Sequence, residues 1–376
     1  MKQILIAPNA FKNSLDAASV AEAIKEGLMQ SKLSFKCICM PVGDGGDGTA
    51  SLLAKHLDAV SIESIVHNPI GKKIKASFWL IEKDQTAIIE LADASGLRLL
   101  QPDEYSPLHA NTLGTGELIK LALDKGAKKI IIGIGGSATI DAGAGIMQAL
   151  GIRFFDEKNN ELKPYPSLFI HLNRIDLMGM DKRINQTELV VLCDVKNKLL
   201  GKEGAAVVFA PQKGTKATDV DFLETALLKF SELVLKQTGK DMSTMEHGGA
   251  AGGVAAGLSA VMNARLVNGI DYFLDHSGFD ALLQNTDMII TGEGSIDNQT
   301  LQGKAPFGVA KRAKEKRIPV VGIAGNLPLQ KDVELEEYFD ALISINHKPM
   351  DMASAIQNTC ENLVRTARML GNLLSL

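Results

Sequence analysis

The N-terminal part of the chain alternates short apolar runs with segments of helical periodicity. Residues 4–7 and 35–42 are apolar enough to predict buried strands. Val20, Ile24 and Leu28 recur at the spacing of one helix face between these runs. A second helical segment follows residue 48, and this β-α-β-α order predicts a parallel sheet covered by helices.

The pattern changes after about residue 61. Three strand-like runs, 61–68, 72–81 and 86–93, follow one another with turns and no helix between them. Adjacent strands of this kind predict hairpins, and therefore a mixed sheet in another domain. Further along, the small-residue stretch 248–257 enters an apolar helix and predicts close helix packing.

The first pattern returns near the C-terminus. Residues 288–291, 319–323 and 341–345 read as short buried strands, separated by helices over 306–316 and about 350–370. We therefore predict a two-domain α/β protein. A discontinuous, Rossmann-like domain with a parallel sheet comprises residues 1–62 and 281–376, and it is interrupted by an inserted α/β domain with a mixed sheet, residues 63–280.

The amino-acid composition argues against nucleic-acid-binding, membrane-spanning and disulfide-rich proteins. The 376 residues are 45% hydrophobic and 22% charged, with a formal net charge of −4, so no basic field is available for nucleic acid or an anionic membrane. The four cysteines lack metal-ligand or disulfide-framework spacing. No apolar run reaches membrane-spanning length, and the N-terminal run is too short for a signal peptide. We expect a cytoplasmic protein, and the sequence leaves its oligomeric state, monomer or homodimer, open.

The most distinctive stretch is residues 128–151, KKIIIGIGGSATIDAGAGIMQALG. An apolar strand breaks into Gly133, Gly135 and Gly136 and continues into a predicted helix. Such a turn can direct N–H groups at an anion, and a helix N-terminus adds partial positive charge. Phosphate is the first candidate, while close packing of helix on sheet explains the glycines equally well.

Acidic residues follow several predicted strands. Asp44 and Asp47 lie in the turn GDGGDG, Asp194 ends a strand, and Glu293 and Asp297 lie in GEGSID. Ligands of parallel α/β sheets bind outside the carboxyl ends of the strands, so these turns could converge on one cleft. Carboxylates there can hold Mg²⁺ or accept a hydroxyl proton, although each could equally be a helix cap.

Two lysines stand at comparable positions. Lys12 follows the first strand, and Lys304 precedes a helix, so either could bind phosphate or carboxylate, or simply be solvated. The seven histidines show no paired ligand spacing, which makes a histidine metal site improbable.

Two familiar nucleotide signatures give different results. No GxxxxGK[ST] motif occurs, which argues against a Walker-type kinase. Gly133-x-Gly135-x-x-Ala138 fits the relaxed dinucleotide pattern, with Asp156 at about the expected distance downstream. An NAD(P)-dependent hydroxy-acid dehydrogenase is therefore one alternative, and a non-catalytic small-molecule sensor is another.

Seven segments together carry a resemblance that spacing alone would not give. They are APNAFKNSLDA, PVGDGGDGT, TLGTGELI, GIGGSATIDAGAGIMQALG, CDVKNKLLGKEGAAVVFAPQKG, GGAAGG and ITGEGSIDNQTLQGKAPFGVA, in this order from residue 7 to residue 310. The chain resembles bacterial glycerate kinases of the sugar-acid and glyoxylate pathway type. It departs from the family pattern at Asn9-Ala10, where Asp-Ser is commoner, and at Asp47, where Glu is commoner.

The resemblance implies ATP-dependent phosphorylation of D-glycerate, with 2-phosphoglycerate favoured over 3-phosphoglycerate as the product. It also implies Mg²⁺ and an active site in a cleft between two α/β domains. The implied partners are glycerate and ATP, with no nucleic acid and no membrane.

We assign the site residues on this basis as hypotheses. Asp194 is the first choice of general base, with Asp44 and Glu293 as alternatives, and Lys12 and Lys304 are the cationic groups. The remaining assignments are substrate binding by Ser14, Asp44, Gly45 and Gly46, nucleotide binding by Gly133, Gly135, Gly136, Ser137, Ala138 and Thr139, and metal binding by Asp47 and Asp297.

Overall fold

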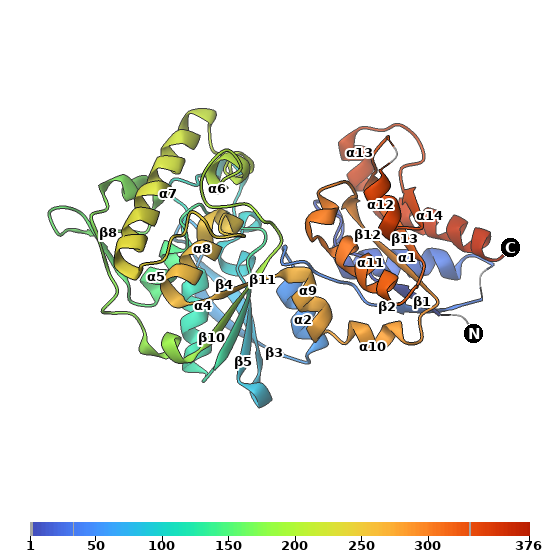
Figure 1. Ribbon diagram of the computed structural model, residues 1–376, viewed down its shortest axis with the longest axis horizontal. Coiled ribbons are helices and arrows are strands. Elements are labelled where there is room, and N and C mark those ends of the chain that lie inside the picture. The colour runs from blue at the N-terminus through green and yellow to red at the C-terminus, as the bar shows by residue number, and fades with distance from the viewer. Residues whose placement is uncertain (1–2, 33, 331) are drawn as a thin grey trace. The chain divides into compact units, whose positions relative to one another are not determined.

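The structure is a computed structural model that describes residues 3–32, 34–330 and 332–376. The chain divides into two compact units, the first comprising Met1–Asp44 and Ile270–Leu376 and the second Gly45–Gly269 (Figure 1). A discontinuous α/β unit with a second one inserted is the organisation expected from the sequence.

The first unit contains a five-stranded, fully parallel sheet in the order β14-β13-β12-β1-β2. Strands from the two ends of the chain therefore share one sheet, as predicted. The strands are β1 (Gln3–Ile6), β2 (Lys36–Cys39), β12 (Met288–Ser295), β13 (Val320–Asn326) and β14 (Ala341–Ser344).

Helices cover this sheet. They are α1 (Ala17–Met29), α9 (Gly269–His276), α10 (Phe279–Leu283), α11 (Ala305–Glu315), α12 (Val333–Tyr338), α13 (Met352–Gln357) and α14 (Thr359–Leu374). Helices α1 and α14 pack side by side (Figure 1). They bury Ile24 and Leu363 in the same core as Ile4 and Ile290 of the sheet. The single helix predicted over about 350–370 is in fact two, because the chain turns at Asn358 between α13 and α14.

The second unit contains a mixed six-stranded sheet in the order β11-β10-β6-β5-β4-β3. The first four strands in this order are parallel, and β5, β4 and β3 form the predicted antiparallel hairpins. The strands are β3 (Val60–His67), β4 (Lys73–Ile81), β5 (Thr86–Glu90), β6 (Lys129–Gly133), β10 (Glu188–Cys193) and β11 (Arg265–Asn268). A small antiparallel sheet joins β7 (Arg153–Phe155), β8 (Glu161–Leu162) and β9 (Arg174–Asp176).

The helices of the second unit are α2 (Thr49–His56), α3 (Ala92–Ser95), α4 (Leu113–Asp124), α5 (Ala144–Ala149), α6 (Ala205–Phe209), α7 (Ala217–Thr238) and α8 (Ala250–Met262). The small-residue stretch packs closely, as expected: Gly252 accepts a hydrogen bond from Ala142 N at 3.0 Å, and a Cβ on Gly252 would lie 2.1 Å from Thr139 O. No helix in the described part of the chain is long and apolar enough to cross a membrane.

The boundaries of the compact units differ from the predicted ones. The units change after Asp44 and after Gly269, earlier in both cases than residues 62 and 280. Helix α2 packs against β5 and β6, and the backbone N–H of Ala50 in α2 donates to Glu90 at the end of β5 at 2.9 Å. Because these contacts lie within the second unit, α2 belongs there and does not complete the N-terminal βαβα series.

Candidate functional site

Glu293 is a buried carboxyl group near the carboxyl end of β12. The residue is 8% exposed, and Oε1 accepts a hydrogen bond from Thr300 Oγ1 at 2.8 Å. Lys304 Nζ lies 4.0 Å from the same oxygen. Burial raises the pKa of Glu293 to about 7, while the positive charges of Lys304 and Lys12 oppose that rise. This carboxyl group can therefore gain or lose a proton near neutral pH.

Asp44 lies close enough to Glu293 to act on it electrostatically. The Asp44 charge helps to raise the pKa of Glu293, and Asp44 itself is 7% exposed. Its Oδ2 accepts hydrogen bonds from Asn9 Nδ2 at 3.0 Å and from Ala305 N, at the start of α11, at 3.3 Å. The structure thus places Asn9, Asp44, Glu293 and Lys304 together at one end of the first unit's sheet.

Lys12 and Ser14 follow β1 in the same unit. Lys12 is exposed, and its backbone nitrogen is 3.7 Å from the position of a Cβ on Gly294, beside Glu293. Ser14 is less suited to its predicted role, because Oγ donates to Ile356 O at 2.8 Å. The hydroxyl proton that would bind a substrate carboxylate is committed to the chain itself.

Asp297 belongs to a polar turn after β12. It accepts hydrogen bonds from Gln299 N at 2.9 Å and from Ser295 Oγ at 3.3 Å, and Asn326 Nδ2 donates to Ser295 at 3.3 Å. The turn brings oxygen ligands to the carboxyl ends of β12 and β13.

In the second unit the two glycine-rich turns lie directly against each other. Gly135 N donates to Gly45 O at 3.0 Å, and a Cβ on Gly135 would lie 2.3 Å from Asp47 N and 2.4 Å from Gly46 Cα. Gly45 has a φ of +99°, and a Cβ there would be 2.9 Å from Leu192 O. The packing explanation for these glycines therefore holds, whatever ligand the turns bind.

The backbone of residues 136–138 pairs with the segment after β5. Leu97 N donates to Gly136 O, and Ala138 N donates to Ser95 O, each at 2.9 Å. The N–H groups of Gly135 and Ala138 are therefore already bonded within the unit. Only other N–H groups of the turn can contribute to an anion site.

The helix after this turn begins later than predicted. Helix α5 starts at Ala144, and the buried carboxylate of Asp141 accepts hydrogen bonds from Gly143 N at 3.2 Å and Gly145 N at 3.1 Å. Thr112 donates to the same carboxylate from both N and Oγ1 at 2.8 Å. The N-terminal charge of this helix is thus neutralised by the chain's own aspartate, which corrects the sequence interpretation.

Lys213 is a buried residue that the sequence interpretation missed. It is 3% exposed, and Nζ donates to Ser137 Oγ and to Thr139 O, both at 2.7 Å. Burial lowers the pKa of Lys213 to about 7, against the opposing effect of Asp141. One feature of the sequence could have drawn attention to it, since Lys213 is the one charged residue among residues 204–215. It holds the two polar residues of the predicted nucleotide turn.

Two other predicted carboxylates are also in the second unit. Asp194 follows β10 and is half-buried, as a residue after a buried strand should be. Asp156 does not resemble a ribose ligand, because it accepts hydrogen bonds from Lys158 N and Asn160 N at 2.8 Å and so shapes the turn between β7 and β8.

The two proposed metal ligands lie in different units of the chain. Asp47 lies in the second unit and is paired with Arg98 at 2.9 Å, whereas Asp297 lies in the first. Among the described residues no group of three or more His, Cys, Asp or Glu side chains could hold a metal ion. The oxygen donors of Asp297 still fit Mg²⁺, which usually takes one or two protein carboxylates together with substrate phosphates and water.

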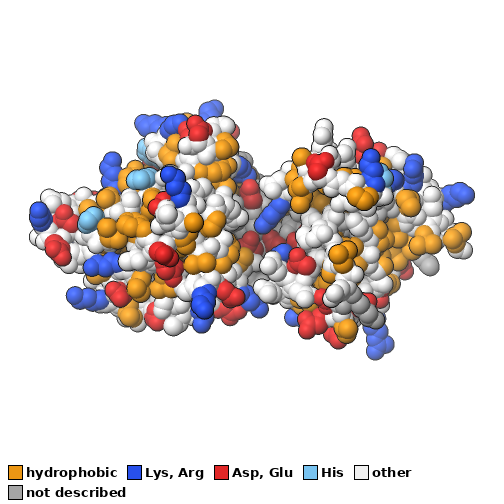
Figure 2. All heavy atoms as spheres, turned by 90° about the horizontal axis from the view of Figure 1, so that it is seen from above, with side chains coloured by type: hydrophobic (Ala, Val, Ile, Leu, Met, Phe, Trp, Pro, Cys, Tyr) orange, Lys and Arg blue, Asp and Glu red, His pale blue; other side chains and the backbone are white. Residues whose placement is uncertain are grey.

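Over the face seen in Figure 2, acidic and basic side chains are interspersed with apolar ones. This distribution agrees with the modest net charge of −4.

Comparison with known proteins points to one family. The profile of the Glycerate kinase family matches residues 4–375. A glycerate kinase of Bacillus subtilis is 42% identical over 97% of this chain and 96% of the relative, and a glycerate 2-kinase of Escherichia coli is 37% identical over 100% and 98%. A solved structure from Salmonella typhimurium LT2, described as a candidate glycerate kinase 2, matches with a TM-score of 0.81 at 40% identity and covers 100% of this chain and 98% of that one.

These relatives are named for a phosphotransferase reaction with an alcohol group as acceptor. The expected family, fold class and enzyme class are thereby confirmed. None of the relatives described here supports the dehydrogenase alternative.

Proposed function

Because the chain belongs to the glycerate kinase family, we propose that it transfers the γ-phosphoryl group of ATP to D-glycerate with Mg²⁺. The proposed product is 2-phosphoglycerate in preference to 3-phosphoglycerate. Phosphoryl transfer needs alignment, neutralised phosphate charge and an oriented hydroxyl group more than covalent chemistry from the protein. The active-site cleft between the two domains stays a prediction.

The observation that carries this proposal is the environment of Glu293. A buried carboxyl group with a pKa of about 7, an ammonium group 4.0 Å away and a fixed hydrogen-bond donor on one oxygen meets the requirements for a general base at neutral pH. We therefore place Glu293 ahead of Asp194 and Asp44 as the group that accepts the glycerate hydroxyl proton. Asp44 already receives two hydrogen bonds, which suits it to orienting its neighbours.

The cationic groups of the first unit complete the acceptor side. Lys304 is half-exposed beside Glu293, so its ammonium group can stabilise the negative charge that develops on the transferring phosphoryl group. Lys12 is exposed and acts on Glu293 electrostatically, and we assign it to the carboxylate of glycerate. We give Ser14 a lesser part in binding the glycerate carboxylate, because its hydroxyl group donates its hydrogen bond to Ile356 O.

The nucleotide phosphates are assigned to the turn of the second unit. Gly133, Gly136, Ser137 and Thr139 provide the turn, while Gly135 and Ala138 fix its shape through their bonds to Gly45 and Ser95. The buried ammonium group of Lys213 fixes Ser137 and Thr139 by donating hydrogen bonds to Ser137 Oγ and Thr139 O. Gly45 and Gly46 support this turn by packing against it, and we assign them a positioning role next to the substrate.

Mg²⁺ would neutralise phosphate charge and bridge phosphate oxygens when it is bound. Asp297 is the better of the two proposed ligands, because its oxygens face only neutral donors. Asp47 is less suitable because Arg98 already neutralises its carboxylate.

A coupled assay for ADP release tests this function directly. The purified chain is given ATP, Mg²⁺ and a panel of small hydroxy acids, and NAD(P)H absorbance is followed in parallel with the same acids. We expect ADP release that depends on D-glycerate and no change in nicotinamide absorbance. Binding of D-glycerate without any turnover would instead favour the sensor class.

A further inference from the structure

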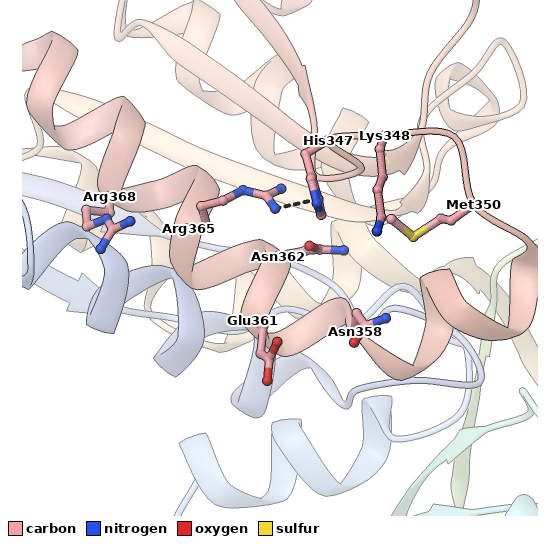
Figure 3. A pocket seen from close by; sticks show the side chains of 8 residues that line it. All are labelled: His347, Lys348, Met350, Asn358, Glu361, Asn362, Arg365 and Arg368. Carbon is pink, nitrogen blue, oxygen red and sulfur yellow. Dashed lines mark hydrogen bonds between the residues drawn. The ribbon is translucent and has the colours of Figure 1, made fainter.

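The first unit contains a polar cavity whose residues have no place in the proposed reaction. It has a volume of about 420 Å³, within the range of small-molecule pockets. Its walls come from the segment after β14 and from the first turns of α14 (Figure 3). His347, Lys348 and Met350 contribute from the segment, and Asn362 and Arg365 contribute from the helix.

The charge of this cavity is opposite to that of the whole chain. Lys348, Arg365 and Arg368 line it against one carboxylate, Glu361, whereas the chain carries a net charge of −4. Among the described residues, no carboxylate lies within ion-pair distance of these three cations. In Figure 3, Glu361 points away from His347 and Lys348. The uncompensated positive charge favours an anionic ligand.

Arg365 also determines which hydrogen-bonding group His347 presents. Its Nη2 donates to Ile345 O at 2.7 Å, and its Nη1 contacts His347 Nδ1. A guanidinium group can only donate, so Nδ1 is the acceptor and the ring proton of a neutral His347 lies on Nε2. His347 is therefore an additional N–H donor at the cavity.

Asn362 independently indicates a ligand, because its buried amide nitrogen lacks a hydrogen-bond acceptor among the described residues. The residue is 2% exposed, and its Nδ2 has no hydrogen-bond partner in the described part of the chain. In Figure 3 the amide nitrogen points toward Lys348 and Met350. A buried N–H group without a partner has lost its hydrogen bond to water and gained none in return, so a ligand oxygen at this place would stabilise the complex.

We propose that this cavity binds a small organic phosphate at a site separate from the glycerate and ATP groups. The groups that gather around its centre are donors: the Lys348 ammonium, the Arg365 guanidinium, the imidazole N–H of His347 and the amide N–H of Asn362, whereas Arg368 lies at the far end in Figure 3. A phosphate group matches them because it carries up to two negative charges and three acceptor oxygens on one centre.

Isothermal titration calorimetry of the full chain tests the proposal with 3-phosphoglycerate, inorganic phosphate and glycerol. The enzyme is first saturated with D-glycerate and a non-hydrolysable ATP analogue, so that the proposed reaction site is filled. We expect 3-phosphoglycerate still to bind, more tightly than inorganic phosphate, and glycerol not to bind. Absence of this residual binding, or equal affinity for phosphoglycerate and phosphate, would overturn the proposal.

Variants assign that binding to the cavity. Lys348 is exposed, so Lys348→Glu should fold normally, and we expect roughly tenfold or greater weakening from reversing a charge that faces phosphate. Asn362→Leu removes the buried amide donor, with roughly tenfold weakening expected. Lys311→Glu makes the same charge change on the exposed part of α11, outside the cavity, and should leave binding unchanged. Wild-type affinity in the Lys348→Glu protein would contradict the assignment.

Discussion

Burial moves two side chains of opposite charge type toward the same pKa. Glu293 rises to about 7 and Lys213 falls to about 7, because desolvation disfavours the charged form of each. They differ in their partners, since Glu293 faces Lys304, whereas Lys213 donates to two neutral oxygens. The first arrangement suits proton transfer, and the second suits positioning of a turn.

The general-base role of Glu293 predicts a large kinetic effect. Glu293→Gln should lower kcat by roughly 10²- to 10⁴-fold, the usual contribution of a general base. In the wild-type enzyme the base must be ionised, so kcat/KM should rise with pH up to about 7 and then level off. Steady-state kinetics between pH 5 and 9 measure both effects.

Asp194→Asn is the matched comparison for this experiment, because Asp194 is the base that the sequence favours. A Glu293→Gln enzyme with near-normal kcat, alongside an Asp194→Asn enzyme that has lost activity, would return the role to Asp194.

Lys213 predicts a pH dependence of stability. Its pKa is lower in the folded protein than the ordinary value of 10.5, so the unfolded chain binds more protons above about pH 7. The free energy of unfolding should therefore rise with pH in the wild type relative to Lys213→Met, by about 2 kcal/mol between pH 7 and 9. Urea unfolding followed by Trp79 fluorescence measures this, since the chain has one tryptophan and it lies in β4 of the same unit. A stability difference that stays constant over this range would contradict the assigned cause.

For single residues, the sequence shows which side chains could take part in the reaction better than it shows which residues they contact. Glu293 and Asp44 could be proposed from their positions after strands, and the structure brings them together. Lys213 is the one charged residue of its segment, but the sequence does not show that it is buried against Ser137 and Thr139, which are far away in the chain. Ser14 shows the converse error, since its bond to Ile356 depends on a C-terminal segment whose position the local sequence does not determine.

At the scale of elements, the turn after β6 is held by packing on several sides. It contacts the 45–47 turn and is hydrogen-bonded to the segment around Ser95. At its far end, Gly252 packs closely against Thr139. The glycine pattern predicted a strand followed by a turn, and both are present. The predicted start of the following helix was wrong because Ala142 and Gly143 adopt positive φ before α5 begins. The Asp141 carboxylate accepts hydrogen bonds from Gly143 N and Gly145 N there, and such bonds leave no periodic signal in the sequence.

The packing at Gly135 predicts a loss of stability on adding one methyl group. A Cβ would meet backbone atoms of Gly46 and Asp47 at 2.3–2.4 Å, so Gly135→Ala should destabilise the second unit by about 1–3 kcal/mol, as overpacking does. Denaturant unfolding with Trp79 fluorescence reports on this unit. Gly126→Ala is the control, because its Cβ meets nothing within 4 Å and only the φ of +85° is strained. Equal stability of the Gly135→Ala and wild-type proteins would contradict the close contact.

At the scale of the whole molecule, sheet topology follows from the hydrophobic pattern. Apolar runs at both ends of the chain predicted one parallel sheet, and consecutive strands in the middle predicted hairpins, as the structure has them. The unit boundaries could not be placed accurately, because α2 follows β2 with no change in sequence texture yet packs on β5 and β6. Periodicity identifies a helix and its buried face, but it does not say which sheet that face covers.

The most direct test of the proposed reaction is proton-coupled ³¹P NMR of the complete mixture of enzyme, ATP, Mg²⁺ and D-glycerate. Transfer to the 2-hydroxyl places phosphate on a carbon with one hydrogen, so the new signal should be a doublet that grows as the γ-phosphate signal of ATP declines. A triplet would place the phosphate on the 3-position and contradict the proposed product. No new phosphate ester, with the ATP signals unchanged, would contradict glycerate phosphorylation itself.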